Sequence, residues 1–123
     1  MWIFKNKGFS KWAVKEGLDD NSLRLAVGEM EAGLVDAVLG GHLFKKRVAL
    51  EGRGKSAGVR TLVAYKSNHR AFFVYGFAKN SRSNISKLEL RALKMYAQVL
   101  LGYSDEELTK AVKNGVLLEV NYE

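Results

Sequence analysis

Three stretches in the middle of the chain carry the apolar and β-branched pattern of strands. They cover about 43–50, 59–66 and 70–77, and the turn Ser67-Asn68-His69 separates the last two. Residues 70–77 are apolar on both strand faces, so this stretch is expected at the centre of a sheet. A shorter strand is expected at 2–5, residues 116–120 are expected to form either a last strand or an extended tail, and Leu39-Gly40-Gly41 is expected to be a loop.

Helical spacing of apolar residues predicts four helices. The first covers about 8–17, and the second begins at Asp19 or Asp20 and continues to about Ala32. Ser86-x-x-Glu89 and Ser104-x-x-Glu107 are capping boxes that open the third and fourth helices. The order of elements predicts an α+β fold, in which the helices gather on one face of a small, mainly antiparallel sheet. We expect residues 1–123 to form a single domain.

Composition excludes several kinds of site. The chain has no cysteine, and His42 and His69 have neither metal-ligand spacing nor companions, so no metal or cofactor is expected. No stretch has the pattern of a signal peptide or the length of a membrane span. These absences predict a cytoplasmic protein.

The stretch Gly52-Arg-Gly-Lys-Ser56 resembles the end of a nucleotide-binding P-loop. That motif requires a glycine five places before Gly54, where this chain has Ala49, and a helix after the loop. Residues 59–65 instead have the composition of a strand. The sequence therefore argues against a nucleotide cradle and leaves open what else would bind phosphate here.

The positive charge is concentrated in the central third of the chain. The formal net charge is +7, and residues 45–82 contain ten of the 20 Lys and Arg but one of the 13 acidic residues. This segment carries a net charge of +9, against −2 for the remainder. Solvation of an ordinary surface would mix the two signs, so the segregation indicates a face that binds a polyanion.

Successive side chains of a strand point to opposite faces, and this alternation predicts which charges share a face. Lys45 and Arg47 share a face of their strand, Arg60 points with Leu62 and Ala64, and Phe73, Tyr75 and Phe77 share a parity. We expect a basic concavity that also includes Arg53, Lys55 and Lys79, with Tyr75 or Phe77 nearby. Cations beside aromatic rings suit RNA, whose phosphates pair with Lys and Arg while unstacked bases pack on rings. Core packing is the simpler explanation for Phe72 and Phe73.

The segment from His42 to Ser86 is similar to the central region of RelE/HigB-type toxins of bacterial type II toxin–antitoxin pairs, and is closest to the HigB-like branch. The resemblance rests on Lys45-Lys46-Arg47, on the loop Gly52-Arg-Gly-Lys55 followed by Gly58-x-Arg60, and on Phe77-Ala-Lys-Asn80. Ser56, Ala57 and Val59 depart from the family pattern.

The resemblance implies a small, metal-independent endoribonuclease that cleaves mRNA on the ribosome. The implied partner is a cognate antitoxin, often with a helix-turn-helix domain, and operator DNA would be bound only through that antitoxin. No membrane partner is implied. The candidate catalytic residues are Lys55, Arg60, Tyr75 and Lys79, and the candidate RNA-binding residues are Lys45, Arg47, Arg53, Asn80 and Arg82.

Two other functions remain open at this stage. ParE-like toxins, which inhibit gyrase, share the implied fold, and a fold does not determine its target. A basic RNA-binding module without catalysis is the second alternative.

Overall fold

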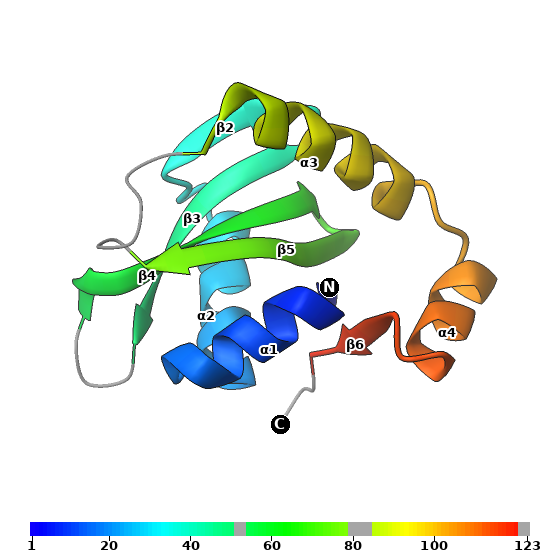
Figure 1. Cartoon of the computed structure of the whole chain (residues 1–123), viewed down its shortest axis with the longest axis horizontal. Helices are drawn as coiled ribbons and strands as arrows, with labels where there is room; N and C mark the ends of the chain where they lie inside the picture. The colour runs from blue at the N-terminus through cyan, green and yellow to red at the C-terminus, as the bar shows by residue number, and fades with distance from the viewer. Residues whose placement is uncertain (51–53, 79–84, 121–123) are drawn as a thin grey trace.

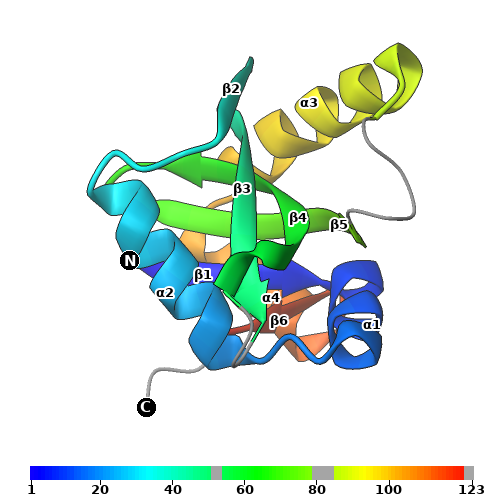
Figure 2. The same ribbon diagram turned by 90° about the vertical axis from the view of Figure 1, so that its left-hand side faces the viewer.

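The computed structural model describes residues 1–50, 54–78 and 85–120, and for residues 54–57 it describes the backbone only. Strands in these ranges form one sheet in the order β2-β3-β4-β5-β1-β6 (Figure 1; β1 is labelled in Figure 2). They are β1 (Trp2–Asn6), β2 (Ala37–Gly40), β3 (Leu43–Leu50), β4 (Gly54–Lys66), β5 (Arg70–Ala78) and β6 (Leu117–Glu119). The pair β1 and β5 is parallel, and the other neighbouring strands are antiparallel.

The helices begin where the sequence predicts them. They are α1 (Lys7–Glu16), α2 (Asp20–Glu31), α3 (Lys87–Leu101) and α4 (Asp105–Lys113). Both predicted capping boxes are present, at Ser86 and Ser104, and Asp19 caps α2 by accepting a hydrogen bond from the backbone N–H of Ser22. Together with the sheet, these helices confirm the predicted α+β class.

The helices cover both faces of the sheet, contrary to the expectation that they gather on one. Helices α1 and α2 pack against the face that carries Phe73, and α3 and α4 pack against the face that carries Phe72 (Figures 1 and 2). The reason lies in β5, whose residues from Ala71 to Val74 are buried on both sides. A central strand that is apolar on both faces must be covered on both.

The loop expected at Leu39-Gly40-Gly41 is shorter than predicted, because β2 occupies part of it. This edge strand pairs antiparallel with β3, and the register shifts between Val38 and Gly40. Four residues that include a glycine carry no clear strand pattern, so only the pairing with β3 reveals the strand.

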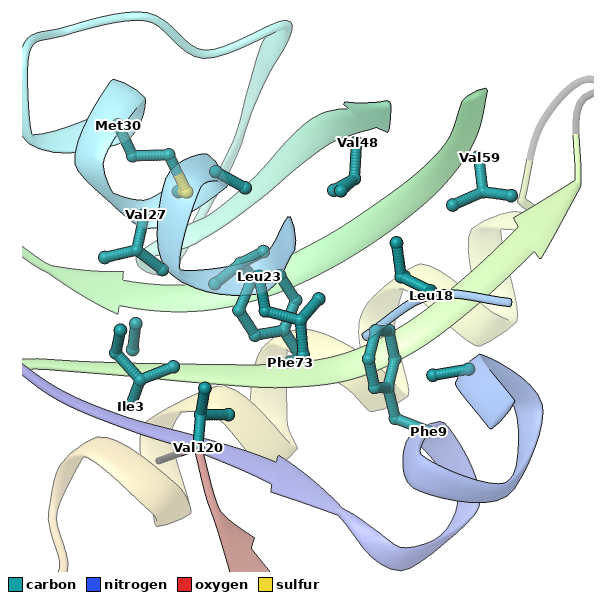
Figure 3. Close-up of a cluster of buried hydrophobic side chains, with 14 of the residues drawn as sticks. Ile3, Phe9, Leu18, Leu23, Val27, Met30, Val48, Val59, Phe73 and Val120 are labelled. Carbon is teal, nitrogen blue, oxygen red and sulfur yellow. The ribbon is translucent and has the colours of Figure 1, made fainter. Parts of the chain in front are cut away.

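The larger of the two hydrophobic cores lies under α1 and α2 (Figure 3). Phe9 from α1 packs against Phe73 from β5 with ring centroids 5.3 Å apart, and Leu23 from α2 is completely buried. Lys46 points into the same face, where its ammonium lies 2.7 Å from the carboxylate of Glu29. This confirms that Lys46 faces away from Lys45 and Arg47.

Gly58 permits β3 and β4 to approach closely where β3 departs from regular pairing. A β-carbon at this position would lie 2.2 Å from the carbonyl oxygen of Val48. The register between the two strands shifts just beyond, between Val48 and Leu50. The glycine of the Gly58-x-Arg60 motif is therefore required by packing.

Gly58→Ala is expected to destabilise the fold by about 1–3 kcal/mol, the usual cost of forcing extra atoms into a packed site. Gly28→Ala is a suitable control, since Gly28 is exposed within α2 and a β-carbon there would meet no atom within 4 Å. Alanine is the better helix former, so the control should gain up to about 1 kcal/mol. Urea unfolding of both variants measures the difference, and equal stabilities would contradict the packing argument.

Candidate functional site

The strand register places three cationic residues on one face of the sheet. Arg47 in β3 lies directly opposite Arg60 in β4, and Lys45 lies opposite Leu62. Leu62 belongs to the core beneath α3, so all three cations share the α3 face of the sheet. We call Lys45, Arg47 and Arg60 the basic face.

A bulge in β5 adds Tyr75 to this face. Phe73 pairs with Val63 and Tyr75 pairs with Leu62, so Val74 is an extra residue between them. Phe73 therefore points into the core under α1, whereas Tyr75 packs on the α3 side. The shared parity expected for Phe73 and Tyr75 is wrong, because a bulge reverses the alternation of side chains after it.

Phe77 completes the row. It pairs with Arg60, so Arg47, Arg60 and Phe77 lie side by side on three neighbouring strands. The rings of Tyr75 and Phe77 have centroids 6.0 Å apart. The expected neighbourhood of cationic and aromatic side chains is thus present in the described part of the chain.

The three cations of the basic face differ in whether a carboxylate pairs with them. Arg47 donates from its backbone N–H and from Nε to the carboxylate of Asp36, at 2.6 and 3.2 Å. Burial by itself would raise the pKa of Asp36, but these hydrogen bonds and the positive charges of Arg47 and Lys46 together lower it. Within the described residues, no carboxylate forms an ion pair with Lys45 or Arg60. Lys45 and Arg60 are therefore the cations best able to attract an anion.

Several predicted site residues lie outside the described residues, namely Arg53, Lys79, Asn80 and Arg82. The backbone of Lys55 belongs to β4, but its side chain is likewise outside the described part. Of the four candidate catalytic residues, the structure thus places Arg60 and Tyr75, which it brings to the same face of adjacent strands.

Both histidines lie in turns, as expected for His69. His42 is exposed in the β2–β3 turn with φ of 62°, and His69 is exposed in the β4–β5 turn. The carbonyl of His42 accepts from the backbone N–H of Tyr65, which places both turns at the end of β4 remote from Arg60. Among the described residues, no cluster of acidic or histidine side chains is arranged to hold a metal ion.

An aromatic pocket that sequence reasoning missed adjoins Tyr75. It has a volume of about 630 Å³, and its lining includes Trp12 from α1, Tyr75 from β5 and Tyr96 from α3. Gly76 was the available signal, since a glycine inside a strand often marks a close approach. Here the approaching group is the ring of Trp12.

The outer surface of α3 carries an apolar stripe. Leu88, Met95 and Val99 are 75%, 67% and 53% exposed and follow one another at helical spacing, with the exposed Ala92 between them. The rest of the described chain therefore leaves this apolar surface of α3 uncovered. The alternative of an extended tail near the C-terminal end is wrong for Leu117–Glu119, which form β6, and Leu117 is buried in the core beneath α4.

Among the described residues, no helix has the length and apolar character needed to span a membrane. A comparison with curated protein sequences found no match. A comparison with protein families found that residues 1–120 match the RelE toxin of the RelE/RelB toxin–antitoxin system. This match covers nearly the whole chain, including the strands of the basic face and both pairs of helices, so the chain belongs to the RelE toxin family.

Proposed function

We propose that this toxin is a metal-independent endoribonuclease that cleaves mRNA on the ribosome. The observation that carries the proposal is the arrangement of Arg60, Lys45 and Tyr75 on one face, in a segment whose net charge is +9. The similarity to the HigB-like branch remains a prediction within this family.

The proposed reaction is attack of a ribose 2′-OH on the adjacent phosphate. The 2′ oxygen forms a new bond to phosphorus, the bond to the leaving 5′ oxygen breaks, and a proton moves from the first oxygen to the second. The intermediate carries extra negative charge, which fixed cationic donors stabilise by about 3–4 kcal/mol each. Cations of the chain would supply this stabilisation without a metal.

Arg60 is best suited to hold the phosphate. Its backbone pairs with Arg47 on one side and Phe77 on the other, so the root of the side chain is fixed by two neighbouring strands. A guanidinium presents two parallel N–H groups that match two phosphate oxygens. Lys79 would act as the second phosphate ligand.

Proton transfer is assigned to Lys55, Lys79 and Tyr75. A lysine crowded by other cations loses its proton more readily, which allows it to act as a base near neutral pH. Tyr75 would donate or relay a proton from its position beside the basic face. Lys45, Arg47, Arg53, Asn80 and Arg82 would hold the RNA backbone on either side of the scissile bond.

There are two rival functions: the first also belongs to a toxin, and the second also uses the positive charge. A gyrase-inhibiting toxin would alter DNA supercoiling after induction and leave mRNA intact, whereas the proposed nuclease would stop bulk translation first. A non-catalytic RNA-binding module would bind RNA but leave it uncut, even with ribosomes present. Lys45, Arg60 and Tyr75 on one face favour the nuclease because they combine charge with a proton donor.

A toxin of this family has a cognate antitoxin, and we propose that it binds the outer stripe of α3. The stripe of Leu88, Ala92, Met95 and Val99 is apolar and exposed, so it suits the apolar face of an amphipathic helix. Exposed Lys87 and Arg91 border it, so the antitoxin helix should carry acidic residues along one edge. We further propose that the antitoxin contains a helix-turn-helix domain and that the toxin reaches operator DNA only through it.

Arg60→Lys tests catalysis. Lysine keeps the charge but loses the two-pronged geometry, so RNA affinity should be mostly retained while cleavage falls by about a hundredfold or more. The control is Arg24→Lys, on α2 and on the opposite side of the sheet, which should leave cleavage unchanged. Primer extension on ribosome-bound mRNA measures cleavage by both variants, and titration with an uncleavable RNA measures their affinity. If affinity and cleavage fall equally, the face acts only as diffuse charge and the binding module is favoured.

RNA binding should also depend steeply on salt. Affinity for a short uncleavable single-stranded RNA should fall as ionic strength rises, with a log–log slope of about 0.7 per phosphate neutralised. Lys45→Ala should reduce that slope by about one such increment. Lys66→Ala, at the far end of β4 from Arg60, should change it little. Affinity that does not vary with salt is incompatible with phosphate binding at the basic face.

Met95→Glu tests the antitoxin surface. A charge in the middle of the stripe should prevent neutralisation, so growth arrest should persist when the product of the neighbouring gene is co-expressed. The control is Val14→Glu on α1, where a valine that is 77% exposed lies outside the stripe. Co-purification of tagged toxin measures binding directly. Full neutralisation of the Met95 variant by the antitoxin would show that the antitoxin does not bind this surface of α3.

A further inference from the structure

The aromatic pocket lies where the edge of β5 is no longer paired with β1. Their parallel pairing ends at Lys5 and Phe73, after which Asn6 pairs only with Leu117 of β6 and caps α1. Beyond that point α1 and α3 flank the end of β5, one from each face of the sheet (Figure 2). At about 630 Å³, the cavity between them is in the size range of small-ligand sites.

Trp12 is held in a fixed position in this pocket. A β-carbon on Gly76 would lie 2.2 Å from Cζ3 of Trp12, so the indole rests directly on the backbone of β5. Phe9 supports the indole from within α1, with ring centroids 5.4 Å apart. Trp12 is only half-buried, and its accessible part lines the cavity. A ring fixed in this way loses little entropy when a ligand stacks on it.

The side chain of Asn6 forms hydrogen bonds to all three elements around the pocket, namely α1, β5 and α3. Its side-chain oxygen accepts from the backbone N–H of Phe9 at 2.7 Å, and its Nδ2 donates to the carbonyl of Val74 at 3.1 Å. The same Nδ2 lies 3.5 Å from the hydroxyl of Tyr96, to which it donates. The hydroxyl of Tyr96 thus accepts from the protein and keeps its own proton to donate to an acceptor on a ligand.

The charge of the lining favours a neutral or anionic ligand. Lys7 is its one charged side chain, and no carboxylate borders the cavity in the described part of the chain. Tyr75 belongs both to this pocket and to the α3 face that carries Lys45 and Arg60. The pocket and the basic face are therefore continuous, and one extended ligand could occupy both.

We propose that the aromatic pocket binds a nucleobase of the RNA whose backbone lies on the basic face. This proposal rests on the proposed ribonuclease function and assigns Trp12 and Tyr96 to substrate binding. A base extruded from the strand would stack on the indole of Trp12. The hydroxyl of Tyr96 and the ammonium of Lys7 would donate to acceptor atoms on the base or on its phosphate.

A peptide strand added to the edge of β5 is the rival occupant, and the hydrogen bonds argue against it. Strand addition requires free carbonyl and N–H groups along the edge. The carbonyl of Val74, at the start of the exposed edge, already accepts from Asn6. Three aromatic walls and the continuity with the basic face instead suit a planar base.

Tryptophan fluorescence provides a direct test, because the chain has two tryptophans. Trp2 lies at the opposite end of β1, where Arg70 stacks over its ring. In the Trp2→Phe variant, Trp12 is the single reporter. A short 2′-O-methyl oligoribonucleotide, which cannot be cleaved, should quench its emission. An abasic oligomer of the same length and backbone should bind without quenching. The matched control is Trp12→Phe, in which Trp2 should report no change with either oligomer.

Affinity gives an independent measurement. Trp12→Ala should weaken binding of the base-bearing oligomer by about 5- to 100-fold, the scale of one stacked base, and should leave binding of the abasic oligomer unchanged. The Trp12→Phe variant keeps an aromatic ring in the pocket and should retain most of the affinity, which guards against a loss caused by misfolding.

The outcomes separate this proposal from the function on which it rests. Salt-dependent RNA binding without quenching of Trp12 would overturn the pocket assignment and leave the ribonuclease proposal intact. Quenching by the antitoxin but not by RNA would show a peptide site and would overturn it as well. Failure of every oligomer to bind at low salt would overturn both proposals.

Discussion

Phe72 and Phe73 are adjacent in β5, completely buried, and directed to opposite faces of the sheet. Phe72 stacks on Phe4 with centroids 5.2 Å apart, and Phe73 packs on Phe9. Burying both rings requires helices on both sides, so one helical pair cannot cover this sheet. The apolar character of one strand therefore dictates the layered arrangement, and the cations of the basic face come from its neighbours β3 and β4.

The bulge at Val74 is what joins this core to the candidate site. Without it, Tyr75 would follow Phe73 onto the α1 side, away from Lys45 and Arg60. With it, one strand supplies a core residue to one face and a polar aromatic residue to the other. Bulges are common next to active sites for this reason, since they redirect a side chain without changing the strand that bears it.

Local patterns in the sequence were sufficient for much of this structure. Capping boxes at Ser86 and Ser104 located two helices, and alternation in β3 and β4 separated Lys46 from its basic neighbours. Features that depend on distant partners were not predictable in this way. The bulge at Val74 follows from how β5 pairs with β4, and the pocket combines Trp12 with Tyr96 from opposite ends of the chain. The shared face of Lys45, Arg47 and Arg60 could be predicted because strand periodicity is local, whereas the pocket arises only from tertiary packing.

The position of β1 has a consequence for the synthesis of the protein. This strand is made first, yet its neighbours in the sheet are β5 and β6, which are made much later. Pairings between segments so distant in sequence form slowly, because much of the chain must be ordered before they contribute. A nascent chain in which β5 has not yet been made would carry Lys45, Arg47 and Arg60, but it would have an unpaired first strand and would lack Tyr75. In a toxin built in this way, Tyr75 joins the basic face and the aromatic pocket forms only after β5 and α3 have been made.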